Sequence, residues 1–292
     1  MSEFTHAVGF GLVTASILAL AAVAVNLQVG VTNFINFAYG DFLTFGAYVA
    51  WVVSSRGFNF FLAVLLGGVA TGLLGVAANA FIFRPFMRRG VRTTTLLIAG
   101  IGLSFITEQG ITLIWGANPL RFNGVSLGTA MTVGPFVLTP GALLMMGSAL
   151  SLLLLLHVLL SRTKFGKSLR ATSENVDLAQ ACGINCERVI SVTWFLAGIL
   201  TAVAGVGLSL QENNLNPVLG FNELFIIFGA VILGGLGRPY GAMLGALVVG
   251  LITEIAGAYV DAAYKTSIAF GIVIILLLFR PQGVLRSAGK TF

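Results

Sequence analysis

Charged residues are scarce in this chain of 292 residues, since Asp, Glu, Lys and Arg together make up only 9% of it. An ordinary soluble domain is about 25% charged, so this sequence cannot cover a surface that faces water on all sides. The scarcity excludes a soluble enzyme, a nucleic-acid-binding module and a disordered scaffold. With 57% hydrophobic residues and a mean hydropathy of +0.99, the sequence instead predicts one integral membrane domain over residues 1–292.

Cysteine and histidine are also scarce, which narrows the possible chemistry. The two cysteines, Cys182 and Cys186, are too few for a disulfide framework, and no histidine lies within ligand spacing of them. The two histidines, His6 and His157, are isolated near the ends of apolar stretches. We therefore expect no metal ion, no cofactor and no catalytic residue.

Long apolar stretches are what the chain has in abundance, and a helix needs about 20 apolar residues to cross a bilayer. Two of the stretches, Phe42–Ser54 and Leu224–Gly235, are short for a full crossing and are predicted to be half-helices. The sequence thus predicts an all-α polytopic membrane protein with about eight or nine transmembrane segments. The nine candidates are Ala7–Leu27, Phe42–Ser54, Phe60–Phe83, Thr95–Trp115, Gly141–Leu160, Val189–Leu210, Leu224–Gly235, Gly241–Tyr259 and Ser267–Phe279.

Basic residues gather in a few of the connections, which assigns the two sides of the membrane. The net charge is +6, and Lys and Arg cluster within residues 84–92, 162–188 and 280–290. All three clusters lie on one side if the N-terminus is outside, and the positive-inside rule makes that side cytoplasmic. This sorting accounts for the positive charge without a nucleic-acid partner. It predicts a cytoplasmic C-terminus, a cytoplasmic loop over 162–188, and a periplasmic loop over 116–139 made of turns and short strands.

A short motif occurs twice and predicts an internal repeat. The first copy reads N-F-I-N-F-A-Y-G from Asn33, and the second reads N-N-L-N-P-V-L-G from Asn213, with asparagine and glycine at the same spacing. Under the charge assignment the two copies lie toward opposite sides of the membrane, which is the relation of an inverted-topology repeat. Interrupted segments at matching positions of two such halves are typical of a transporter's substrate path. The alternative is that both copies are ordinary interfacial turns at helix ends.

Four acidic residues lie in or beside the apolar stretches. Asp41 and Glu223 follow the two copies of the motif, and Glu108 and Glu254 lie inside predicted segments. Intramembrane carboxylates face protein or water and are candidates for function by default. For Glu108 and Glu254 we favour a structural role, in which each side chain bonds to a neighbouring helix.

Four further patterns follow one another along the chain. Residues 35–41 read I-N-F-A-Y-G-D and are followed by G-A-Y at 46–48. Residues 174–184 read E-N-V-D-L-A-Q-A-C-G-I, residues 233–237 read L-G-G-L-G, and residues 280–283 read R-P-Q-G. Together these patterns resemble the signature segments of the branched-chain amino-acid ABC importer permeases. The family has two types of permease subunit, and the short form of this sequence, without a long N-terminal extension, resembles the H-type more than the other type.

The resemblance implies a type II ABC importer of a bacterial inner membrane, with this chain as a permease subunit. Its partners would be two cytoplasmic ABC ATPases, a second permease that is identical or homologous, and a periplasmic substrate-binding protein. Tyr39 stands where the family usually has His, and Asp41 where it usually has Glu. Urea or a short amide is therefore an alternative to a branched-chain or other neutral amino acid as the substrate. A stand-alone ion-coupled secondary transporter is a further alternative.

The resemblance and the repeat give two sets of candidate residues. For coupling to the ATPases we expect a short cytoplasmic helix that begins near Glu174, is capped by Ser173 and ends at Gly183. The coupling set comprises Ser173, Glu174, Asp177, Ala181, Gly183 and Ile184. The substrate-path set comprises Asn33, Asn36, Tyr39, Asp41, Asn213, Asn216 and Glu223.

Overall fold

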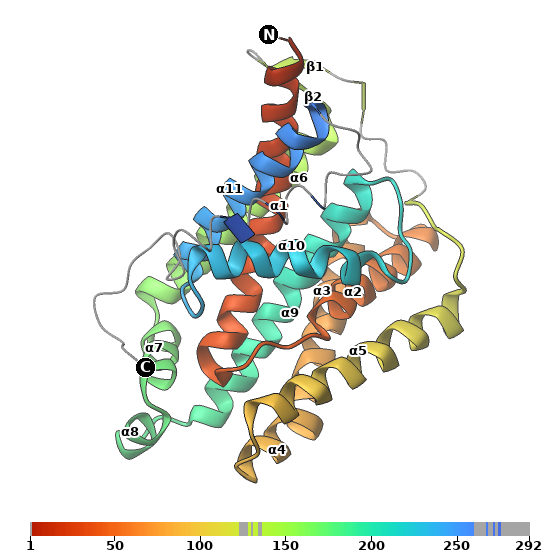
Figure 1. The fold of residues 1–292 in the computed structure, drawn as a ribbon. Coiled ribbons are helices and arrows are strands. Elements are labelled where there is room, and N and C mark those ends of the chain that lie inside the picture. Colours follow the sequence, from red (N-terminus) through yellow and green to blue (C-terminus); the bar gives the residue numbers. More distant parts are fainter. Residues whose placement is uncertain are drawn as a thin grey trace.

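The computed structural model describes residues 2–122, 128–129, 131–133 and 136–259, together with the isolated positions 267, 271, 274 and 275. Over these residues the chain forms a bundle of helices with one short antiparallel hairpin (Figure 1). The hairpin pairs β1 (Met131–Val133) with β2 (Phe136–Leu138), and it lies in the loop for which short strands are predicted.

The helices fall into two runs along the chain. Before the hairpin they are α1 (Ser2–Thr32), α2 (Tyr39–Ser55), α3 (Phe60–Ala78), the π-helix η1 (Asn79–Phe83), α4 (Arg84–Arg88) and α5 (Thr93–Trp115). After it they are α6 (Pro140–Arg162), α7 (Lys164–Glu174), α8 (Val176–Ala181), α9 (Cys186–Gln211), α10 (Leu219–Gly234) and α11 (Pro239–Tyr259).

Eight of the nine predicted segments correspond to α1, α2, α3, α5, α6, α9, α10 and α11. Six of the described helices are long and apolar enough to cross a membrane, whereas α2 and α10 have 17 and 16 residues. The prediction that these two are short elements is confirmed. The ninth segment, Ser267–Phe279, lies mostly outside the described residues.

Helix α1 lies at the centre of the bundle (Figure 1). In its most apolar stretch 83% of the residues are buried by other parts of the chain, compared with 22% in α5 and 17% in α6. The apolar surfaces of α5 and α6 therefore remain largely free for lipid or for another subunit, while α1 is enclosed by protein.

Two sets of three helices pack in corresponding ways. Helix α1 packs against α11 as α3 packs against α9, and α2 packs against α3 as α10 packs against α11. Exchanging α1, α2 and α3 for α9, α10 and α11 therefore preserves these packing pairs. In Figure 1, α1 descends from the N-terminus while α9 rises beside it, so the two sets have opposite directions. This arrangement agrees with the predicted inverted repeat.

Small residues permit the close approach between these helices. A Cβ at Gly198 of α9 would lie 2.6 Å from Gly72 Cα of α3, and a Cβ at Gly250 of α11 would lie 2.6 Å from Ala15 Cα of α1. Only glycine allows backbones to meet at such distances, and such contacts stabilise helix pairs in lipid, where no hydrophobic effect drives association.

The passage from α3 to α4 is continuous and contains the five-residue π-helix η1. The backbone N–H of Arg84 donates to the carbonyl of Asn79, five residues earlier. Pro85 follows directly, and a proline ring clashes with the carbonyl four residues before it in a regular α-helix. The wider π turn accommodates the proline and carries the helix past the apolar region into the basic segment.

Side-chain caps begin many of the other helices. In each case an Asn or Thr oxygen accepts a hydrogen bond from a backbone N–H of the first turn, as is usual for these residues. The caps are Asn59, Thr139, Thr163, Asn175 and Asn185. Helices α2 and α10 follow Ala38 and Val218, which provide no side-chain cap, so their first turns depend on neighbouring segments.

Candidate functional site

The two copies of the motif adopt the same backbone conformation at their first asparagine. Asn33 has φ 56° and Asn213 has φ 50°, and these are the positive-φ residues other than glycine in the described part of the chain. Asparagine enters the left-handed region more readily than most side chains. Each of these residues ends a long helix, α1 or α9, and turns the chain into an irregular segment.

The asparagine at the fourth position of each copy, Asn36 or Asn216, begins the next helix. The carbonyl of Asn36 accepts from the N–H of Tyr39 at 3.3 Å, and the carbonyl of Asn216 accepts from the N–H of Leu219 at 3.2 Å. The matched asparagines therefore perform matched tasks, one ending a helix and one starting the next. The predicted repeat is present in the backbone geometry as well as in the sequence.

The two breaks meet where α2 and α10 begin. A Cβ on either Gly40 or Gly220 would collide with the carbonyl oxygen of the other glycine, so the two backbones are in direct contact. Thr44 of α2 stabilises this contact, because its Oγ1 accepts a hydrogen bond from the Gly220 N–H at 2.9 Å. Segments 180 positions apart in the sequence are thus joined at the first turns of two half-helices.

At the first break, Asn36 is buried and only partly satisfied. Its Oδ1 accepts from the N–H of Ala38 at 3.1 Å, while its Nδ2 has no hydrogen-bond partner in the structure. Helix α5 approaches at Gly100, where a Cβ would lie 3.2 Å from both Asn36 Oδ1 and the backbone nitrogen of Phe37. The break is therefore covered by α5.

Asp41 is fully buried one turn further on. One carboxylate oxygen, Oδ2, accepts a hydrogen bond from Ser104 Oγ of α5, and Oδ1 has no hydrogen-bond partner in the structure. Ser104 was not among the predicted site residues. The sequence does show a hydroxyl at Ser104 within a largely apolar stretch, one turn before Glu108. The helical periodicity of that stretch, however, does not show that Ser104 lies beside Asp41.

Tyr39 is buried against the central helix α1. Its side chain is 1% exposed, and its hydroxyl donates to the carbonyl of Ala21 in α1 at 2.8 Å. This bond ties the start of α2 to the central helix.

The second break is closed by the loop that follows α5. Leu120 and Leu215 exchange two backbone hydrogen bonds, of 2.8 and 2.9 Å. Asn213 is exposed, Asn216 is half-buried with its Oδ1 unpartnered, and Glu223 is half-buried in the first turns of α10. The two breaks thus share a contact at their glycines, while Asn33 and Asn213 lie at the far ends of two oppositely directed helices.

Glu254 belongs to a separate polar cluster that joins three helices. Its Oε1 accepts from Thr14 Oγ1 of α1 at 2.7 Å and from Gln211 Nε2 of α9 at 3.3 Å. Gln211 Nε2 also donates to Thr14 Oγ1 at 2.5 Å. These bonds agree with the structural role favoured for Glu254.

The loop over 162–188 folds into a helical hairpin of α7 and α8. The expectation that Ser173 caps the second helix is wrong, because Ser173 lies inside α7, where its hydroxyl donates to the carbonyl of Arg170 at 2.8 Å. Asn175 has extended backbone angles and separates the helices. Its Oδ1 accepts from the N–H of Leu178 at 2.9 Å, so α8 begins at Val176.

Gly183 ends the hairpin as predicted. It has φ 81°, a conformation that favours glycine, and its N–H donates to the carbonyl of Gln180 at 2.9 Å. The N–H of Ile184 donates to the carbonyl of Ala179 at 3.0 Å. Ala179 is buried against the rest of the chain, and the exposed residues of the hairpin include Glu174, Asp177, Leu178 and Ala181.

The start of α9 contacts both the hairpin and α4. The buried thiol of Cys186 lies 3.6 Å from both Thr172 Oγ1 and the carbonyl of Val176. Next to it, Glu187 accepts from Arg84 and from Arg88 of α4, the latter at 2.5 Å. The hairpin and α4 are therefore connected through side chains at the start of α9.

Comparison with known proteins gives matches along nearly the whole chain. Residues 7–278 match the family described as branched-chain amino acid transport system / permease component. The high-affinity branched-chain amino acid transport system permease protein LivH of Escherichia coli (strain K12) is 29% identical over 94% of this chain and 93% of its own length. The permease protein BraD of the corresponding system of Pseudomonas aeruginosa is 28% identical over the same shares.

A solved structure is similar in fold. PsaBC from Streptococcus pneumoniae in complex with Fab superposes with a TM-score of 0.55 and 16% sequence identity, covering 95% of this chain and 93% of that one. At this identity the likeness concerns the arrangement of helices alone, and it agrees with the expected permease fold.

Proposed function

Since this chain belongs to the permease component family of branched-chain amino acid transport systems, we propose that it lines the path of a branched-chain or other neutral amino acid through an inner membrane. The observation that carries the proposal is the contact between two matched helix breaks at Gly40 and Gly220. Lipid cannot satisfy the free backbone groups of a broken helix, so such breaks persist only against protein or a polar path.

The unpaired polar atoms at the breaks fit a zwitterionic substrate. Buried groups without a partner cost about 1–3 kcal/mol each, so they are retained where another state supplies a partner. Asp41 Oδ1 and Asn216 Oδ1 are acceptors suited to an ammonium group, and Asn36 Nδ2 is a donor suited to a carboxylate. We assign Asn33, Asn213 and Glu223 to the mouths of the path, and Tyr39 to the wall that holds α2 against α1.

Energy would enter through the α7–α8 hairpin. The exposed residues Glu174, Asp177 and Ala181 form the surface for one of two partner ABC ATPases, with Ser173, Gly183 and Ile184 holding its shape. ATP hydrolysis would take place in those subunits, so we assign this chain no catalytic residue. A second permease, identical or homologous, and a periplasmic binding protein complete the importer. The hairpin and C-terminus lie in the cytoplasm, and the N-terminus and the β1–β2 loop lie outside.

Two glycines provide a matched test of this coupling. Gly183 and Gly57 both have positive φ, 81° and 85°, and a Cβ at either position meets open space. Gly183→Val and Gly57→Val therefore introduce the same backbone strain, one at the hairpin and one in the turn between α2 and α3. In proteoliposomes containing the complete importer, we expect Gly183→Val to abolish ATP-driven uptake and transport-linked ATPase stimulation while Gly57→Val retains both.

Membrane insertion of both variants serves as the control for folding. Equal uptake by the two variants would overturn the assignment of the hairpin. Substrate class is measured in the same vesicles by comparing labelled leucine, isoleucine and valine with urea and acetamide. Uptake of the amides alone would replace the proposed substrate while leaving the coupling intact.

A further inference from the structure

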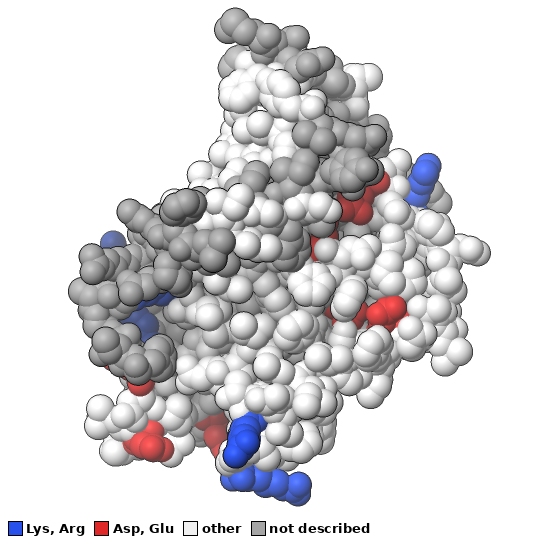
Figure 2. All heavy atoms as spheres, in the orientation of Figure 1, with Lys and Arg blue, Asp and Glu red and all other residues white. Residues whose placement is uncertain are grey.

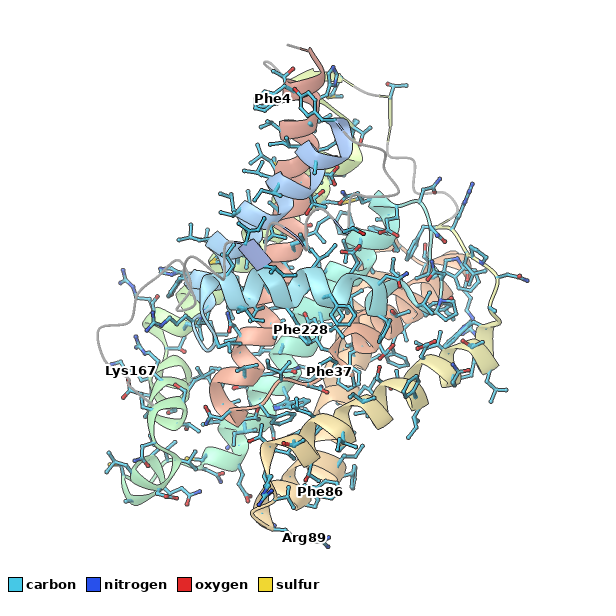
Figure 3. All side chains as sticks on the ribbon, in the orientation of Figure 1. Phe4, Phe37, Phe86, Arg89, Lys167 and Phe228 are labelled. Carbon is cyan, nitrogen blue, oxygen red and sulfur yellow. The ribbon has the colours of Figure 1, made fainter. Side chains whose placement is uncertain are left out.

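A concave basic surface lies at the end of the α3–η1–α4 helix, away from both breaks. It encloses a cavity of about 290 Å³ lined by Ala80, Arg84, Pro85, Arg88 and Arg89. Ala80, Arg84 and Arg88 follow one another at intervals of four residues and share a helix face, with Pro85 and Arg89 beside them. Figure 3 labels Arg89 at the lower end of the molecule, near Phe86, and Figure 2 shows basic side chains gathered at that end.

This cavity adjoins surface suited to hydrocarbon. Phe81 lies one position from Ala80, and its side chain is 81% exposed. Leu73, two turns earlier in α3, is 59% exposed. The same helix therefore passes from apolar side chains that face outward to three guanidinium groups within a few turns. A phospholipid has groups that match these in the same order, with acyl chains for the apolar side chains and a headgroup phosphate for the guanidinium groups.

Positive charge is in excess at the cavity. Glu187 is the acid that pairs with Arg84 and Arg88, so one carboxylate is shared by two guanidinium groups. Within the described residues, Arg89 has no carboxylate within ion-pair distance. The three arginines and one glutamate leave two positive charges beside the bilayer, and guanidinium groups bind phosphate oxygens in a bidentate geometry.

We propose that this cavity binds the phosphate headgroup of an anionic phospholipid, with the acyl chains lying along Phe81 and α3. The basic pocket at a membrane boundary supports this occupant, since such pockets hold anionic headgroups. The headgroup would contact the two arginines that hold Glu187, so lipid binding acts next to the connection between α4 and α9. The site is separate from the proposed path and does not depend on which substrate is transported.

The experiment measures lipid retention by native mass spectrometry of the full-length permease in its membrane complex, after delipidation. Phosphatidylglycerol is titrated in, with phosphatidylcholine and inorganic phosphate as parallel arms. Arg89→Gln is compared with Arg92→Gln, because both arginines are exposed and three positions apart, but only Arg89 lines the cavity. We expect Arg89→Gln to weaken phosphatidylglycerol binding about fivefold, the contribution of one basic side chain beside an anionic surface, and Arg92→Gln to leave it within twofold.

Each arm of the experiment decides for or against the site. Equal loss in the two variants would mean a diffuse basic surface, and no loss in either would mean that the cavity is not the site. Binding of phosphatidylcholine with the same affinity would remove the role of headgroup charge. If millimolar inorganic phosphate displaced phosphatidylglycerol completely, the ligand would be a soluble anion, and the lipid proposal would be overturned.

Discussion

Gly220→Ala is the smallest substitution that separates the two helix breaks. The added Cβ would lie 2.5 Å from the carbonyl carbon of Gly40 and 2.7 Å from Thr44 Oγ1, whereas ordinary contacts begin at 3.4 Å. Because both neighbours belong to a packed helix, α2 and α10 would have to separate by roughly 1 Å, a backbone shift of the kind that overpacking forces.

The expected loss of stability follows from three contributions. Overpacking of a closely packed interior costs about 1–3 kcal/mol. Separation of the helices also weakens the 2.9 Å bond from the Gly220 N–H to Thr44, and a buried donor left without its partner costs about 1–3 kcal/mol. The better helix propensity of alanine returns about 1 kcal/mol. The net expectation is a destabilisation of about 3 kcal/mol with strongly reduced uptake.

The assay is the thermal midpoint of the purified permease complex, followed by ATP-driven uptake in proteoliposomes. Gly147→Ala is the matched control, because Gly147 is a glycine inside α6 where a Cβ meets no atom within 4 Å. It carries the same gain in propensity without the collision. If Gly220→Ala were as stable and as active as Gly147→Ala, the contact between the breaks would not be a structural requirement, and the proposed path would lose its main support.

Two further substitutions test the hairpin and the polar cluster. Asn175→Ala removes the side-chain cap of α8, which is worth about 1 kcal/mol. We therefore expect ATP-driven uptake to be severalfold slower in this variant. Asn175→Ser retains a capping oxygen and is expected to show near-normal uptake. Equal rates for the two variants would contradict this role. Glu254→Leu removes the acceptor that Thr14 and Gln211 share, although Gln211 still donates to Thr14 and Thr14 to the Phe10 carbonyl. We expect it to lower stability by about 1 kcal/mol, measured as the thermal midpoint, whereas Glu254→Gln keeps an acceptor oxygen. A Glu254→Leu protein as stable as Glu254→Gln would show that the cluster contributes nothing.

Local chemistry in the sequence predicted the positions of the breaks well. Asn33 and Asn213 ended helices because asparagine tolerates a left-handed backbone, and Gly183 ended α8 for the same conformational reason. The cap of α8 was placed two residues early, because Ser173 and Asn175 are both capping residues. The choice between them depended on α7 extending through Glu174.

Contacts between distant segments could not be predicted from the sequence. The meeting of Gly40 with Gly220 and the bond of Ser104 to Asp41 join helices whose order in space is absent from local periodicity. The burial of α1 inside the bundle could not be predicted from the sequence either. A membrane helix is apolar whether it faces lipid or protein, so hydropathy does not distinguish the central helix from a peripheral one.

The central position of α1 has a consequence for biogenesis. Helix α1 leaves the ribosome well before its partner α11, which begins roughly 200 residues later. At a synthesis rate of about 5–20 residues per second, α1 waits roughly 10–40 s in the membrane before that partner is made. During this interval its buried polar residues, Asn26 and Gln28 among them, have to be sheltered by the insertion machinery or by early neighbours. The central helix is thus synthesised well before α11, the helix that packs against it along the described part of the chain.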